Sequence, residues 1–133
     1  MTSSSDPRPV SPHLSIWRFT PTMAASITHR ATGVALYGGT LFLAIWLIAA
    51  ASGPEAFGQV SALYSSFIGR LALFGWTWAV LFHLMNGLRH FFWDAGRGLA
   101  PQTASSTAVF IYVASVVLAV AIWVAGYAAK GAL

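Results

Sequence analysis

Three ionisable residues and a glycine recur at helical spacing between residues 83 and 94. His83, Gly87, His90 and Asp94 stand at i, i+4, i+7 and i+11, so a helix that turns about 100° per residue presents all four on one face. The residues around this stripe are otherwise as apolar as a membrane span. Ionisable side chains are costly in hydrocarbon and normally face a bundle interior, a cofactor or a water-filled cavity. The stripe therefore predicts a functional site inside a membrane domain.

His83 has the chemistry of a haem ligand. It lies about 11 residues, or roughly 16 Å along a helix, from Asp94 near a membrane boundary, which places its imidazole near mid-membrane. A neutral imidazole there suits haem iron, and Gly87 would leave room for a flat macrocycle. His90 is about 10 Å further along the axis, too far to bind the same iron, so we expect it near a propionate or another polar group. The alternative is that His83 only hydrogen-bonds to a neighbouring helix and that Gly87 only serves helix packing.

A second polar cluster comprises Ser26, His29 and Arg30. Ser26 and Arg30 are one helical turn apart on the same face, with His29 beside them. A hydroxyl, an imidazole and a guanidinium near an apolar boundary could hold a carbonyl ligand such as a quinone, or neutralise haem carboxylates. The alternatives are that Arg30 only anchors the helix to lipid phosphates and that Ser26 bonds back to its own helix.

Composition sets the class of protein that positions these residues. The 133 residues are 57% hydrophobic and only 8% charged, whereas about a quarter of residues are charged in soluble domains. The sequence predicts an all-α integral membrane protein with three transmembrane helices, because a membrane crossing needs about 20 apolar residues. We expect these helices at about 21–51, 60–92 and 103–130, in an up-down-up bundle over residues 21–131 that packs with a partner membrane subunit, preceded by a cytoplasmic segment at 1–20.

Local signals support the ends of these helices. Thr20 can cap the first helix and Pro21 suits its first position. The sequence Ser-Gly-Pro-Glu at 52–55 breaks that helix, and Pro101 separates the second helix from the third. The first 20 residues lack the apolar core of a signal peptide, so we expect the first span to remain in the mature protein.

Charge and cysteine content exclude several functions. The net charge is +4, but the cations are scattered along an apolar chain, which argues against nucleic-acid binding. The chain has no cysteine, which excludes disulfides, Cys-ligated iron–sulfur clusters and thioether-attached haem.

The basic residues also predict an orientation. Those on the N-terminal side of the bundle are Arg8, Arg18, Arg30, Arg89 and Arg97, and those on the opposite side are Arg70 and Lys130. Because cytoplasmic flanks carry the excess of positive charge, we expect a cytoplasmic N terminus and a periplasmic C terminus.

Two motifs carry a resemblance to a known family. The first is an Arg-Pro pair at residues 8–9, followed by Ser-x-x-His-Arg-x-Thr at residues 26–32. The second is His-x-x-x-Gly-Leu-Arg-His-Phe-x-Trp-Asp-x-Gly at residues 83–96. In this order, and on a chain of this length with three predicted helices, they resemble the two signatures of the cytochrome b subunit of succinate dehydrogenase. No motif position departs from that pattern.

The resemblance implies a haem site. His83 would be one axial ligand of a b-type haem, and a histidine of a partner membrane subunit would be the other. His13, His29 and His90 agree with this, because by sequence all three fall toward the cytoplasmic end and away from the depth of His83. His29, Arg30 and His90 would lie in the region of the haem propionates.

The resemblance also implies a quinone site. Ser26 and Arg30 would contribute to a ubiquinone pocket, and Trp17 would approach the quinone. A hydroxyl and a guanidinium on a quinone carbonyl would stabilise the negative charge that develops there. Asp94 would lie near the same face and serve in proton supply or subunit docking.

The family implies that the electrons come from other chains. This sequence has no cysteine and no dinucleotide-binding glycine motif, so succinate would be oxidised elsewhere. The partners would be a flavoprotein, an iron–sulfur subunit and a second small membrane-anchor subunit, making this chain a non-dehydrogenase subunit of an oxidoreductase. Its location would be a bacterial inner membrane, because the N terminus lacks an Arg-rich amphipathic transit segment. The alternatives are a haem-free structural anchor, an anchor of a fumarate-reducing relative, and an ion or proton channel.

Overall fold

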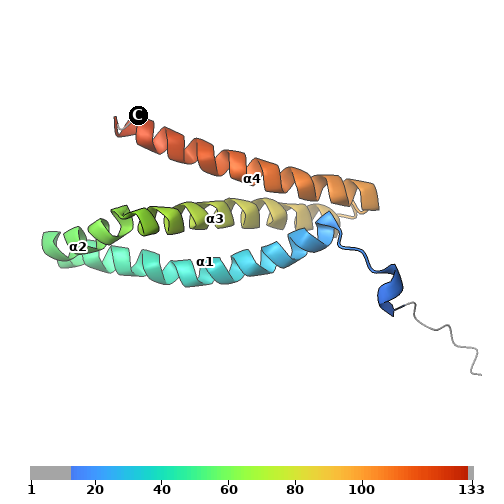
Figure 1. The fold of residues 1–133 in the computed structure, drawn as a ribbon, viewed down its shortest axis with the longest axis horizontal. Helices are drawn as coiled ribbons and strands as arrows, with labels where there is room; N and C mark the ends of the chain where they lie inside the picture. The colour runs from blue at the N-terminus through green and yellow to red at the C-terminus, as the bar shows by residue number, and fades with distance from the viewer. Residues whose placement is uncertain (1–12, 132–133) are drawn as a thin grey trace, which may run out of the picture.

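The computed structural model describes residues 13–131. They form a short 3-10 helix, η1 (His13–Ile16), and the α-helices α1 (Pro21–Ser52), α2 (Pro54–Ser65), α3 (Phe67–Asp94) and α4 (Pro101–Ala129). Figure 1 shows the three long helices side by side, with α3 between α1 and α4, and α2 at the end of the bundle where α1 finishes. Helices α1, α3 and α4 are each long and apolar enough to cross a membrane. The predicted all-α fold with three membrane-spanning helices is confirmed.

The beginning of α1 follows the capping signals. The Thr20 side chain accepts a hydrogen bond from the backbone N–H of Met23 at 3.2 Å, and Pro21 takes the first helical position. The cap satisfies one N–H that has no partner within the helix. This fixes where α1 starts, and with it the position of Ser26, His29 and Arg30 in the second and third turns of the helix.

The prediction of one long helix over about 60–92 is wrong at its beginning. Residues 54–65 form a separate helix, and Ser66 adopts an extended backbone (φ −62°, ψ 163°) between α2 and α3. The Ser66 hydroxyl accepts from the Gly69 N–H at 3.1 Å and donates to the Leu63 carbonyl at 2.7 Å. Serine competes with helical hydrogen bonds in this way. A hydropathy pattern does not register such a break.

The end of α3 is closed by a Schellman motif. Gly96 has a positive φ of 71°, which favours glycine. The Gly96 N–H donates to the Trp93 carbonyl at 2.8 Å, and the Arg97 N–H donates to the Phe92 carbonyl at 2.9 Å. The Trp93 indole N–H also donates to the Gly98 carbonyl at 3.1 Å. These bonds hold the turn that directs the chain from α3 into α4.

The bundle core is small and lies where the three long helices meet. Ala25, Phe82, Ala108 and Ile111 form its buried cluster. Phe82 packs on Tyr112 with ring centroids 4.8 Å apart. Much of the rest of the apolar surface is exposed, as expected for helices that face lipid or a partner subunit.

A hydroxyl pair joins α1 to α4. The side-chain oxygens of Thr28 and Tyr112 lie 2.6 Å apart. Residues of α4 that face the bundle and are buried include Ala104, Ala108 and Ser115, and such small side chains let helix backbones approach closely.

Arg89 does not behave as the surface cation that the orientation argument assumed. Its side chain is only 7% exposed. It donates to the Asn86 side-chain oxygen at 3.3 Å and to the Ala104 carbonyl of α4 at 2.6 Å. Arg89 therefore belongs to the α3–α4 interface.

Candidate functional site

His83 is held by α1 through one ring nitrogen. Its Nδ1 lies 3.1 Å from the His29 carbonyl oxygen and 3.2 Å from the Thr32 hydroxyl oxygen. A carbonyl only accepts, so Nδ1 must carry the proton in this bond. The Thr32 hydroxyl itself donates to the His29 carbonyl at 2.9 Å, which leaves its lone pairs to face Nδ1. The Nε2 atom of His83 consequently carries the lone pair.

This arrangement is typical of a metal-binding histidine. A ligating imidazole usually donates its other N–H to a backbone carbonyl, which fixes both its tautomer and its orientation. No group of three or more His, Asp or Glu side chains in residues 13–131 is arranged to hold a metal ion. Haem iron, in contrast, takes only its axial ligands from protein, so a single oriented imidazole is enough for one side.

Three imidazoles from two helices, those of His29, His83 and His90, form one cluster. The rings of His29 and His83 are stacked, with centroids 3.9 Å apart and an interplanar angle of 12°. The His90 ring lies 5.4 Å from that of His29 and 5.1 Å from the Trp93 ring. The cluster thus joins the two motifs that lie far apart in the sequence.

The expectation that His29 lies away from the depth of His83 is wrong. The prediction counted residues along each helix separately. The side-by-side packing of α1 and α3 instead sets the two rings face to face. Two imidazoles that share one iron approach it through their nitrogens from opposite sides. A face-to-face stack is not that geometry, so it does not make His29 the second ligand.

Gly33 allows the close contact between α1 and His83. The sequence analysis predicted no role for Gly33 or for Thr32. A Cβ at position 33 would stand 3.2 Å from Cε1 of His83. Thr32 is buried at 4% exposure. The signal that could have indicated both residues is their position one turn after His29, on the helix that carries the first motif. By contrast, a Cβ at Gly87 would meet nothing within 4 Å, so packing within this chain does not require a glycine there.

Ser26 and Arg30 form a pair on the exposed side of α1. An Arg30 Nη2 donates to the Ser26 hydroxyl oxygen at 3.1 Å. Both side chains are exposed. Because the serine oxygen accepts this bond, its own hydrogen remains available to a further acceptor.

Other predicted site residues are not brought into this pair. Trp17 precedes α1, is 54% exposed, and packs near Phe19 with ring centroids 6.4 Å apart. Within residues 13–131 no hydrogen bond or ring contact joins Trp17 to Ser26 or Arg30. Asp94 is the last residue of α3 and is exposed. The Arg-Pro pair of the first motif, at residues 8–9, lies outside the described residues.

Comparison with known proteins identifies the family. The succinate dehydrogenase/fumarate reductase transmembrane subunit family matches residues 4–122. This chain belongs to that family. The match covers both motifs and the whole of α1, α2 and α3.

Individual relatives agree with this membership. The succinate dehydrogenase cytochrome b556 subunit of Paracoccus denitrificans is 42% identical over 113 residues, which cover 85% of this chain and 87% of the relative. The b556 subunit of Rickettsia felis is 36% identical over 88% of this chain and 91% of the relative. The mitochondrial cytochrome b560 subunit of Sus scrofa is 35% identical over 78% of this chain and 63% of the relative. The resemblance found in the two motifs is confirmed.

Proposed function

We propose that this chain is the membrane-anchoring cytochrome b subunit of a succinate:ubiquinone oxidoreductase, and that it binds haem b through Nε2 of His83. The observation that carries the haem assignment is the hydrogen bond from His83 Nδ1 to the His29 carbonyl. It leaves Nε2 as the free lone pair, directed by α1 rather than free to rotate.

The residues around His83 suit both the propionates of a haem and its flat macrocycle. When bound, the haem supplies a one-electron redox centre within the membrane. His29, His90 and Arg30 would neutralise its propionates, and Gly87 keeps that face of α3 clear of side chains. A histidine of a second membrane-anchor subunit would supply the other axial ligand.

The quinone site is assigned to Ser26 and Arg30. Trp17 does not contact this pair within residues 13–131, and it would approach the quinone itself. The Ser26 hydroxyl accepts from Arg30 and can donate its own hydrogen to a ubiquinone carbonyl. The guanidinium then stands close to the oxygen on which negative charge develops during reduction, which lowers the free energy of that charged state. The chain itself thus orients the quinone, while a flavoprotein and an iron–sulfur subunit deliver the electrons.

Location and orientation belong to the same proposal. The chain would lie in a bacterial inner membrane, with a cytoplasmic N terminus and a periplasmic C terminus. The end of the bundle that carries Ser26, Arg30 and Arg97 would then face the soluble subunits. Asp94 at that end would serve in proton supply or docking.

The haem assignment is tested by the reduced-minus-oxidised absorption spectrum of the complex purified through a tag on this chain. Wild type should show a b-type signal, His83→Ala should lose or shift it, and His90→Gln should keep it. An intact wild-type complex without haem would favour a haem-free anchor. Loss of the signal in His90→Gln but not in His83→Ala would contradict the ligand assignment.

The quinone assignment is tested by separating two activities of the same complex. Ser26→Ala and Arg30→Gln should each impair quinone reduction while succinate oxidation by an artificial dye continues. Ser106→Ala, a change of an exposed serine on α4, should affect neither. Equal loss of both activities in the Ser26 and Arg30 variants would refute the assignment. In a separate measurement, ion conductance by this chain alone would favour a channel.

A fumarate-reducing role is the second candidate, because the family includes both kinds of enzyme. The relatives named above are all succinate dehydrogenase subunits, which favours succinate oxidation. Comparison of the two directions in the purified complex decides between them.

A further inference from the structure

A cavity of about 380 Å³ opens between α3 and α4, near the end of α3. It does not belong to the histidine cluster. Met85 and Phe92 line it, and on a helix they point roughly 180° away from His83. The residues that line it also include Leu88, Arg89, Trp93, Arg97, Phe110 and Ile111.

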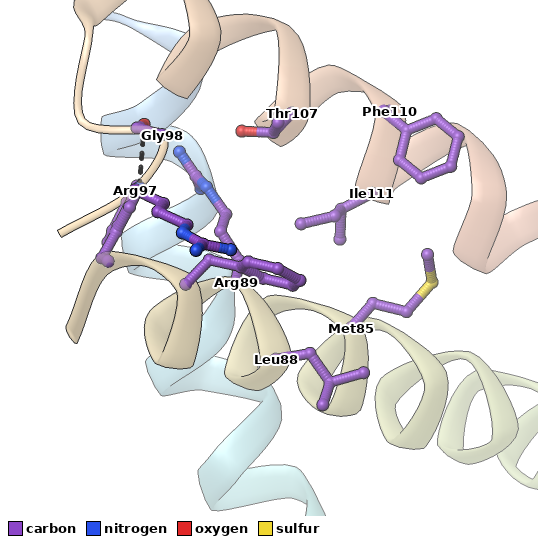
Figure 2. A pocket seen from close by; sticks show the side chains of 10 residues that line it. Met85, Leu88, Arg89, Arg97, Gly98, Thr107, Phe110 and Ile111 are labelled. Atoms are coloured by element: carbon purple, nitrogen blue, oxygen red, sulfur yellow. Dashed lines mark hydrogen bonds between the residues drawn. The ribbon is translucent and has the colours of Figure 1, made fainter. Parts of the chain in front are cut away.

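One end of this cavity is positively charged. Figure 2 shows the side chains of Arg89 and Arg97 together at that end. The buried Arg89 donates to an amide oxygen and a backbone carbonyl, and its guanidinium carbon lies 4.1 Å from the Trp93 ring centroid. None of these partners carries a charge. Its Nε atom is buried and has no hydrogen-bond partner. A guanidinium in this position favours an anion nearby.

The other end of the cavity is apolar. Met85, Leu88, Phe110 and Ile111 lie there, away from the two arginines (Figure 2). These side chains belong to helices that are apolar enough to span a membrane. A ligand that fills the whole cavity must therefore carry an anionic group and a hydrocarbon segment in continuity.

We propose that this cavity binds one phospholipid with an anionic headgroup. Its phosphate would pair with Arg97 and Arg89, since arginine binds phosphate through paired charge-assisted hydrogen bonds. One acyl chain would lie along the apolar end, between α3 and α4. Basic pockets between transmembrane helices are suited to anionic lipid headgroups. Because α3 and α4 are candidate membrane spans, lipids of the surrounding bilayer would have direct access to this cavity.

Arg97 is the residue to change first. Arg89 also binds the Ala104 carbonyl, so its replacement could unfold the α3–α4 pair. Arg97 is exposed and follows α3. Arg70→Gln, at the opposite end of α3 and also exposed, is the matched control. Leu88→Trp adds bulk at the apolar end without changing the charge.

The experiment uses the intact complex, delipidated in detergent and examined by native mass spectrometry with added dioleoylphosphatidylglycerol, dioleoylphosphatidylcholine or inorganic phosphate. Wild type and Arg70→Gln should bind phosphatidylglycerol in preference to phosphatidylcholine. Arg97→Gln should bind phosphatidylglycerol about tenfold more weakly, the effect of losing one charge-assisted contact. Leu88→Trp should also weaken the binding of phosphatidylglycerol.

Three outcomes would overturn the proposal. Equal binding of the two lipids would remove the role of the anionic headgroup. Unchanged phosphatidylglycerol binding in Arg97→Gln would place the lipid elsewhere. Displacement of phosphatidylglycerol by inorganic phosphate, with Leu88→Trp behaving as wild type, would indicate a site for a free anion instead.

Discussion

Substitution of Gly33 by alanine tests whether close helix contact orients His83. The added Cβ would lie 3.2 Å from Cε1 of His83, whereas carbon atoms pack best at about 3.5 Å or more. The ring must then move by about 0.3 Å. Its Nδ1 contacts of 3.1 and 3.2 Å could lengthen to roughly 3.4 and 3.5 Å, at the outer limit of hydrogen bonding.

The energetic effect follows from that displacement. Adding one methyl group to a packed site costs about 1–3 kcal/mol, and the small movement required here places Gly33→Ala near the lower value. About 1 kcal/mol corresponds to a roughly fivefold loss of haem affinity, provided that the ring relaxes when haem is absent. The haem dissociation rate should therefore rise several-fold and the b-type spectrum should shift.

The control for this prediction is a second glycine of α1. A Cβ at Gly38 meets nothing within 4 Å, and Gly38→Ala brings the same change in helix propensity as Gly33→Ala. Haem content per complex, the reduced-minus-oxidised spectrum and the haem dissociation rate are measured for both variants. A Gly33→Ala complex that matches wild type in all three would refute the reasoning. So would an equal loss in Gly38→Ala.

Two further predictions concern the same helix. Thr32→Val removes the hydroxyl 3.2 Å from His83 Nδ1. It should weaken haem binding by about tenfold, because loss of the group that hydrogen-bonds to a metal ligand typically costs tenfold or more in affinity. Thr32→Ser keeps a hydroxyl and should bind haem like wild type, and the haem dissociation rates of the two variants test this prediction. Gly39→Ala would force a Cβ into the Trp76 indole, so we expect the complex to lose about 2 kcal/mol of stability. A melting temperature equal to that of Gly38→Ala would contradict that second prediction.

Much of the architecture could be predicted from composition and local signals. The apolar lengths of α1, α3 and α4 indicated three spans, because hydrocarbon thickness sets a minimum helix length. The Thr20 cap was predictable because capping depends on a few neighbouring residues. The break at Ser66 was missed, since it lies between two helical segments and depends on the hydrogen bonds that the Ser66 hydroxyl makes with Leu63 and Gly69.

The candidate site was predictable only in part. The spacing of His83 and His90 placed them on one face, and the spacing of Ser26 and Arg30 correctly indicated a contact that the structure shows at 3.1 Å. Gly33 escaped notice because its role depends on a side chain 50 positions away in the sequence. The burial of Arg89 escaped notice as well, because it depends on the Ala104 carbonyl of another helix. An arginine near a helix end usually faces lipid phosphates instead.

The sequence by itself determined the membrane class, the helical periodicity and the family, because these depend on local composition and on two short motifs. Tertiary structure decided which nitrogen of His83 is protonated, since that depends on the His29 carbonyl of another helix. It also decided that His29 stacks on His83 and that Arg89 turns toward α4. These features arise where helices pack, and helical periodicity specifies the faces of a helix without specifying what each face meets.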